Sequence, residues 1–370
     1  IEDLEVGDRI QLPADVVVRA SEAARSSGTR DAWFDPDTGL LYYENDAAGA
    51  SVSAVQLPAS AREKSFSVSG DQNGLFITVL PGTPGAPDLV AASDSGGFDN
   101  DNLTRLNTPS FSVSLAGSGA AVDNQIVLRA GGSIVAAKVL SSSDVAAGSV
   151  VLRVGDSTTQ FGSVATTLSN GSASVTATQW SAGFESSAST PLAVTIDRTA
   201  PASPTLTLAA GSDTGIAGDR ITSQTAPQVE VSFSTSEVSA GGVAQILMGS
   251  QVVATQTISA ADAIAGKVLV TAAGLGSDGA KQLTATVADA AGNVSSASGA
   301  LTITLDTAAP SAPRLSLKAS SDTGLLADDR ITNLPSLEIE VRFEPSQVAA
   351  GAVVALSSAS GVVASRAITA

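Results

Sequence analysis

Three acidic loops recur along this 370-residue chain and hold most of the side chains that could do chemistry. Residues 93–104 read SDSGGFDNDNLT, residues 212–222 read SDTGIAGDRIT, and residues 321–332 read SDTGLLADDRIT. Carboxylates this close repel one another by about 1 kcal/mol per pair at 4 Å in water. Ca²⁺ is bound by about six to eight oxygens, chiefly Asp carboxylates and backbone carbonyls. The loops are therefore candidate calcium sites; the alternative is that Asp and Gly here only form turns.

Two further acidic motifs lie near these loops. Asp197 and Asp306 each begin a D-x-x-A-P sequence, in which the proline fixes the direction of the chain. Residues 289–293 read DAAGN, which predicts a hairpin turn carrying carboxylate and amide oxygens. We expect Asp306, this turn and the third loop to converge at the junction of two modules. The candidate metal ligands are Asp94, Asp99, Asp101, Asp197, Asp213, Asp219, Asp289, Asn293, Asp306, Asp322, Asp328 and Asp329.

The spacing of these motifs predicts tandem modules. They recur with a period of about 110 residues, together with strands that alternate apolar and polar residues, such as VEVSF at 229–233 and IEVRF at 339–343. This alternation and period are typical of immunoglobulin-like β-sandwiches. The predicted fold class is all-β, with Ig-like sandwiches in an elongated array. The predicted modules are a small β-rich unit at 1–85 and sandwiches at 86–199, 200–308 and, in part, 309–370.

The first 85 residues are expected to contain short strands and tight turns. The turn at 35–39 reads DPDTG and predicts a hairpin; a calcium loop through Asp35, Asp37 and Asp46 is the alternative, although the glycine that such a loop needs is missing. A single helical turn is expected near 260–265. The strands are expected at 16–18, 40–43, 51–57, 65–69 and 75–80.

The composition excludes several classes of function. With 36 acidic and 19 basic residues the net charge is −17, so we expect no nucleic-acid partner. The absence of Cys and His removes disulfides, thiol chemistry, His-based triads and His-ligated zinc. No apolar run approaches the roughly 20 residues of a membrane helix. Glu338 and Glu340 share one strand face and are expected to be solvated surface, so we expect no enzyme.

The combination of D-x-x-A-P, SDTG, DRIT and DAAGN resembles the bacterial Ig-like repeats of giant type I-secreted, RTX-type, biofilm-associated adhesins. The first 60 residues resemble, more loosely, the β-rich segments beside the glycine-aspartate repeats of such proteins. The resemblance implies an extracellular, cell-surface stalk in which calcium joins neighbouring modules and an adhesive tip meets a receptor. It also implies a site formed by Asp197, Asp213 and Asp219, where Trp180 and Phe184 replace the DAAGN residues.

The sequence is also consistent with other functions. A self-assembling surface layer or filament would use calcium to bridge other copies of the chain. A carbohydrate-binding module would use Trp33 or Trp180. No D-x-x-A-P aspartate precedes the first loop, which makes it the least complete candidate site. Ala370 corresponds to Ala260, so we expect the third sandwich to be truncated, the alternative being that another chain completes it.

Overall fold

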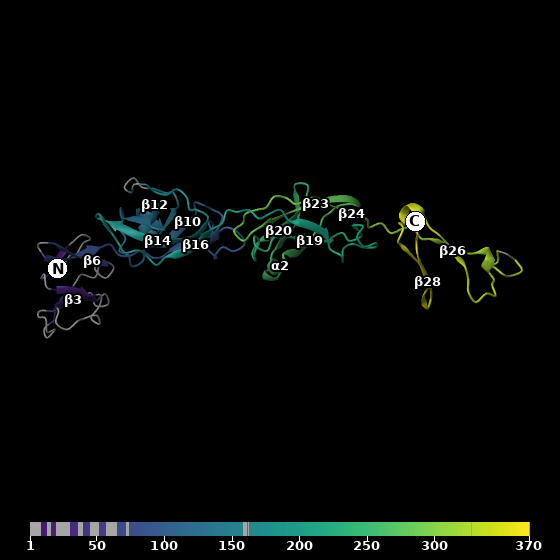
Figure 1. Ribbon diagram of the computed structural model, residues 1–370, viewed down its shortest axis with the longest axis horizontal. Helices are drawn as coiled ribbons and strands as arrows, with labels where there is room; N and C mark the ends of the chain where they lie inside the picture. The colour runs from purple at the N-terminus through teal and green to yellow at the C-terminus, as the bar shows by residue number, and fades with distance from the viewer. Residues whose placement is uncertain are drawn as a thin grey trace. The chain divides into compact units, whose positions relative to one another are not determined.

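Strands dominate the described part of the chain, as the alternating pattern predicts, and the all-β fold class of tandem sandwiches is confirmed (Figure 1). The chain divides into two compact units, Ile1–Ala200 with Ala288–Asn293, and Pro201–Val287 with Val294–Ala370. The structure, a computed structural model, describes residues 9–12, 16–19, 30–35, 40–44, 52–56, 65–71, 74–157, 161, 163–326 and 328–369.

The N-terminal module contains two sheets among its described residues. One has the strand order β1-β7-β6 and the other β2-β3-β4-β5. The five predicted strands are present, and β1 and β3 are additional. Asp35 lies opposite Leu40 in the antiparallel β3–β4 pair, as the predicted hairpin requires, while residues 36–39 and Asp46 lie outside the described residues. The strands are β1 (Arg9–Leu12), β2 (Val16–Arg19), β3 (Arg30–Asp35), β4 (Leu40–Glu44), β5 (Val52–Gln56), β6 (Ser65–Asp71) and β7 (Gly74–Leu80).

The first sandwich packs two sheets over one apolar core. Its core includes the fully buried Phe111, Leu128 and Leu152, and Phe111 lies between the polar Ser110 and Ser112 on its strand. One sheet has the order β13-β10-β8, and the other β12-β11-β14-β16-β9, with β15 added to β14. The strands are β8 (Pro87–Leu89), β9 (Leu103–Thr104), β10 (Ser110–Ser114), β11 (Gln125–Ala130), β12 (Ser133–Val139), β13 (Ser149–Arg153), β14 (Gly171–Ser181), β15 (Phe184–Glu185) and β16 (Leu192–Ile196).

The second sandwich repeats this topology. One sheet has the order β17-β19-β22 and the other β18-β24-β23-β20-β21. Val229 and Val231 are fully buried, whereas Glu230 between them points outward and pairs with Lys267 at 2.9 Å. The strands are β17 (Thr205–Leu208), β18 (Ile221–Thr222), β19 (Gln228–Ser232), β20 (Val243–Met248), β21 (Gln251–Thr257), β22 (Lys267–Thr271), β23 (Gly279–Ala288) and β24 (Leu301–Leu305).

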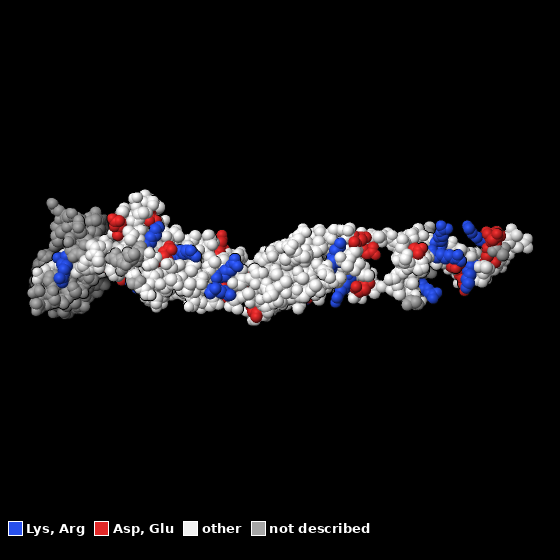
Figure 2. Space-filling view, turned by 90° about the horizontal axis from the view of Figure 1, so that it is seen from above, with Lys and Arg blue, Asp and Glu red and all other residues white. Residues whose placement is uncertain are grey.

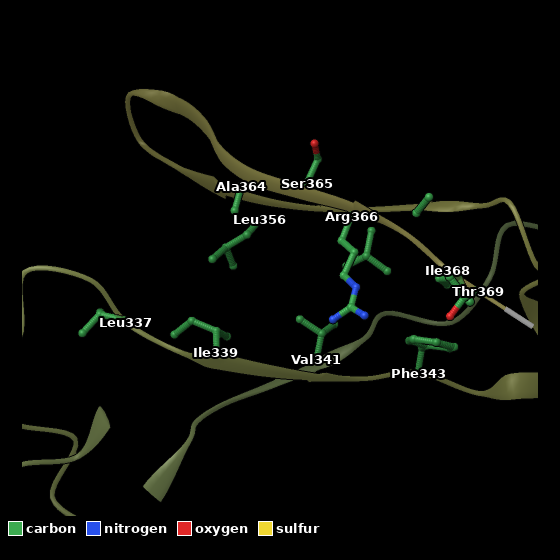
Figure 3. Close-up of a pocket in the computed structure, with 12 residues that line it drawn as sticks. Leu337, Ile339, Val341, Phe343, Leu356, Ala364, Ser365, Arg366, Ile368 and Thr369 are labelled. Carbon is green, nitrogen blue, oxygen red and sulfur yellow. The ribbon is translucent and has the colours of Figure 1, made fainter. Parts of the chain in front are cut away.

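The third module has only the first strands of this pattern among its described residues. Its strands pair as β25 with β26 and β27 with β28, and a groove with a volume of about 450 Å³ lies between the two pairs. Figure 3 shows Ile339 and Val341 facing Leu356 and Arg366 across it. The elements are β25 (Arg314–Leu317), η3 (Ala319–Ser321), β26 (Ile339–Arg342), η4 (Pro345–Gln347), β27 (Val353–Ser358) and β28 (Gly361–Ala367).

Two short helices interrupt the strands. The turn predicted near 260–265 is α2 (Ala260–Ala265), and α1 (Ser142–Ala147) is an equivalent helix that was not predicted. Each begins with a capping box: in α1 the Ser141 hydroxyl accepts from the Asp144 amide, and the Asp144 carboxylate accepts from the Ser141 amide. Each has six residues, so no α-helix in the described ranges has the length or apolarity to cross a bilayer.

Replacing Asp144 by Ala should remove about 1 kcal/mol of stability at pH 7, as loss of a helix cap does. Hydrogen bonds from Ser141, with Lys138 nearby, lower the pKa of Asp144 from 3.8 to about 2. The contribution is therefore complete above about pH 4 and lost as the pH falls through about 2. Urea unfolding followed by Trp33 and Trp180 fluorescence, both in the first unit, measures this. An equal loss in the exposed β8 variant Asp88→Ala would contradict the capping assignment.

Candidate metal site in the acidic loops

The first two acidic loops each lie beside the aspartate that ends their own sandwich. At the end of the first loop, β9 pairs in parallel with β16, so that Thr104 lies opposite Ile196 and its carbonyl accepts a hydrogen bond from the Asp197 amide at 2.8 Å. The second sandwich repeats this arrangement through β18 and β24, and the Asp306 amide donates to the Thr222 carbonyl at 2.9 Å. A two-residue strand at the sheet edge thus fixes the position of the loop.

The same hydrogen bonds hold all three loops in shape. In the first, the buried Ser93 hydroxyl accepts from the Ser110 amide at 2.9 Å, and the Asp101 carboxylate accepts from the Leu103 amide at 3.0 Å. Such side-chain to backbone bonds fold a loop without help from a distant partner. The equivalents of Ser93 are Ser212 and Ser321, and those of Asp101 are Asp219 and Asp329.

A non-glycine residue adopts a left-handed backbone at the same place in each loop. Its φ is 59° at Asn102, 62° at Arg220 and 64° at Arg330. This conformation costs about 1–2 kcal/mol for an ordinary residue. In the first loop it directs the Asn102 amide to an oxygen of Asp94 at 3.2 Å, and the Asn102 carbonyl to the Thr195 amide at 2.9 Å. The left-handed backbone at Asn102 therefore positions the amide that holds the Asp94 carboxylate.

The aspartate after the repeated loop serine has one buried oxygen without a hydrogen-bond partner in all three copies. These oxygens are Oδ1 of Asp94, Asp213 and Asp322. Asp94 is 7% exposed, and its other oxygen accepts from Asn102. A buried polar atom without a hydrogen bond costs about 1–3 kcal/mol. Because the same atom is left unpaired three times, the loops are suited to a ligand that approaches this oxygen.

The electrostatics of the first loop favour a cation. Burial raises the pKa of the Asp94 carboxyl above its ordinary value, and the neighbouring Asp101 carboxylate raises it further. Both effects oppose the ionised form. A positive ion beside Oδ1 would reverse the repulsion and replace the lost hydration. Over the face drawn in Figure 2, the exposed acidic side chains stand in small groups, several of them with Lys or Arg nearby.

The turn Ala288–Asn293 meets the first loop, which corrects its predicted grouping with Asp306 and Asp322. The Asn293 side-chain amide donates to the Asp197 carbonyl at 2.9 Å and to Asp289 Oδ2 at 2.9 Å. The Asn293 backbone amide donates to Asp289 Oδ1 at 2.8 Å. β23 runs antiparallel to β24, with Gly279 opposite Leu305. Asp289 therefore lies at the far end of β23, about 30 Å from Asp306 at about 3.3 Å per residue.

The predicted grouping of Asp213 and Asp219 with Asp197 is wrong for a related reason. Parallel pairing of β18 with β24 brings their loop beside Asp306 instead. The predicted placing of Trp180 at the position of Asp289 is also wrong. The Gln179 amide donates to Ser186 as the Val287 amide donates to Ser295, so Ser181 takes the place of Asp289. Trp180 packs edge-on against Phe161, with 5.3 Å between ring centroids. Asp99 and Asp328 are exposed and take no part in the repeated hydrogen bonds.

The donor set matches a hard cation in kind. The first loop brings together the Asp94 and Asp101 carboxylates, with one Asp94 oxygen unpartnered. Asp289 has both carboxylate oxygens hydrogen-bonded to Asn293 and holds that residue in place. Across the described ranges, no three carboxylates form a ready cluster. An ion here would complete its shell with backbone carbonyls and water, as Ca²⁺ commonly does.

The first loop also contacts the turn through two uncharged residues, which the pattern of acidic residues in the sequence does not indicate. Ser95 donates from its hydroxyl to the Ala291 carbonyl at 2.7 Å, and Gly96 lies directly against the same turn. The signal was present in the sequence, because Ser95, Thr214 and Thr323 repeat a hydroxyl residue before a glycine.

One module of the chain matches a known family. Residues 199–307 match the model of the bacterial Ig-like domain family. No curated protein matches the chain.

Several solved structures are similar at low identity. The BSP domain of a biofilm-associated protein is 18% identical over 62% of this chain and 30% of that chain, with a TM-score of 0.20. A tetra-tandem repeat from the extending region of a large adhesion protein is 17% identical over 75% and 65%, with a TM-score of 0.24. Fibronectin(III)-like modules of Clostridium thermocellum CbhA are 12% identical over 55% and 87%, with a TM-score of 0.31. The chain thus spans under a third of the first structure and just under two thirds of the second. At TM-scores this low, the similarities are not evidence of function.

Asp94→Asn should change how the metal-free first unit responds to acid. Because the folded-state pKa of Asp94 is raised, folded protein takes up this proton first, and stability rises as the pH falls through that pKa. The variant should lack this rise. Melting in chelator between pH 7 and pH 4, followed by tryptophan fluorescence, measures it. Asp99→Asn is the control and should behave as the wild type; identical profiles for both variants would contradict the assignment.

Proposed function

We propose that this chain, whose second sandwich belongs to the bacterial Ig-like domain family, is a non-catalytic stalk segment of an extracellular bacterial surface adhesin. Ca²⁺ bound at the acidic loops would stiffen the stalk and so support cell adhesion and biofilm formation. The observation that carries the proposal is the unpartnered oxygen shared by Asp94, Asp213 and Asp322. A repeated chemical feature at a repeated place supports a role in the array of modules.

In the first unit, Asp94 and Asp101 would hold the ion. Bound there, Ca²⁺ would supply positive charge to the unpartnered oxygen and cancel the repulsion between the two carboxylates. The site is positioned by hydrogen bonds within the chain. Ser93 and the left-handed Asn102 fix Asp94, and Asn293 ties the turn to the Asp197 carbonyl.

The contribution of the bound ion to the stalk would be mechanical stiffness. Asp94 lies in the loop that also contacts the turn Ala288–Asn293, so an ion that orders the loop also orders its contact with the turn. Extracellular calcium modules commonly bind at about 10⁻⁴–10⁻³ M. At a hundredfold excess over Kd, one site adds about 2.7 kcal/mol to the folded state.

A self-assembling surface layer or filament is the second candidate, and one observation favours it. Among the described residues, β21 lies at the edge of its sheet in the second sandwich, with β20 on one side only, and its Val252 is 46% exposed. Unpaired edges of this kind can pair with another chain. In this case calcium would also act at contacts between copies.

Calcium should stabilise the first unit through Asp94. We expect saturating Ca²⁺ to add about 2–3 kcal/mol to the wild type and less than about 1 kcal/mol to Asp94→Asn. Asp213→Asn is the matched control, because it removes the equivalent carboxylate from the second unit, whereas both tryptophans report on the first. Tryptophan-detected melting, with calorimetry for stoichiometry, gives the answer. No heat and no shift at millimolar calcium would refute the calcium-stiffened stalk.

Chelation separates the two candidate functions. A stalk segment should stay monomeric in chelator and become more flexible, whereas a layer or filament should be assembled in calcium and fall apart without it. Light scattering gives the mass of the particles, and small-angle X-ray scattering gives their dimensions with and without calcium. Particles larger than one chain in calcium that dissociate in chelator would overturn the stalk in favour of the assembly.

A further inference from the structure

The first acidic loop holds the turn Ala288–Asn293 by contacts in which no carboxylate takes part. The Ser95 hydroxyl donates to the Ala291 carbonyl at 2.7 Å. The same Ser95 oxygen accepts from the Arg105 amide at 2.9 Å, which fixes its direction. Ala290 and Ala291 are 8% and 1% exposed. The loop therefore encloses this turn largely through one hydroxyl and through backbone packing.

Glycine makes the close approach possible on both sides. Gly96 has φ of 119°, and a Cβ added there would lie 1.8 Å from the Ala290 carbonyl oxygen. Gly292 has φ of 88°, and its added Cβ would lie 3.3 Å from the Gly96 Cα. The two backbones touch where any side chain would separate them. The fit thus requires a small, glycine-bearing turn.

We propose that Ser95 and Gly96 form a receptor for turns of the D-A-A-G-N kind and hold the turn without a metal ion. Asn293 adds a second point of recognition through the Asp197 carbonyl at 2.9 Å. The partner that fits is therefore an Ig-like module whose turn has two small residues and a glycine between Asp and Asn. The turn of the first sandwich, with Ser181 and Phe184 at the places of Asp and Asn, does not meet this requirement.

The other two acidic loops carry the same pair of a hydroxyl residue and a glycine. Thr214 precedes Gly215, and Thr323 precedes Gly324. Gly215 has φ of 86°, close to the value at Gly292, yet an added Cβ there would meet nothing within 4 Å. No atom of the described residues therefore lies close to an added Cβ at Gly215, in contrast to Gly96.

The test uses the full chain in chelator and hydrogen exchange of the peptide that covers the turn. Gly96→Ala should raise exchange in this peptide at least tenfold, because the new methyl group displaces the Ala290 carbonyl. Gly215→Ala makes the same change at a similar positive φ with no neighbour, and should leave exchange of the turn unchanged. Ser95→Ala, a milder change that keeps the loop backbone, should raise exchange about threefold or more.

Each outcome decides the proposal independently of calcium binding. Protection of the wild-type turn that persists in chelator and falls in Gly96→Ala supports the receptor. If chelator alone opens the wild-type turn as far as Gly96→Ala does, the metal holds the turn and the proposal is wrong. The proposal is equally overturned if Gly96→Ala and Gly215→Ala exchange alike. Failure to bind calcium would leave these results unaffected.

Discussion

The structure depends on a carboxylate oxygen that folding removes from water without giving it a partner. Parallel pairing of β9 with β16 draws the first acidic loop onto the sheet edge, and the loop then closes over Asp94. Desolvation disfavours the charge of that carboxylate, and Asp101 adds repulsion. A fold that needed only a turn here could place Asn or Ser at this position. The proposal of a cation rests on the recurrence of this aspartate, with its unpartnered oxygen, in three loops.

In the first acidic loop, the groups that fix the backbone conformation differ from the carboxylate oxygen that is available to a ligand. Its shape comes from neutral contacts such as the Ser93 hydroxyl bond to the Ser110 amide and the turn closed by Asp101 on the Leu103 amide. These bonds are local and persist whether or not a cation is near. The remaining carboxylate oxygen of Asp94 is held in a fixed direction by this frame. Preorganisation of this kind lowers the ordering cost of binding a ligand.

The second and third modules show what the later strands contribute to a sandwich. Val229, Val231 and Ile246 are fully buried in the second, while their counterparts line the open groove of the third. In the second sandwich the strands β22, β23 and β24 contribute apolar side chains that complete the core around these residues. Apolar alternation therefore specifies which face of a strand turns inward, but burial needs an opposing sheet.

The sequence by itself determined the all-β class, the period of the modules and the identity of the acidic loops, because alternation and turn chemistry are local. It placed α2 but not α1, although the same serine–aspartate capping box begins both helices. Only the tertiary structure decided which acids meet. The direction of β23 carries Asp289 to Asp197 rather than to Asp306, and the short pairs β9–β16 and β18–β24 bring each loop to its own sandwich end. Strand direction and edge pairing are long-range properties, which the spacing of residues along one chain does not contain.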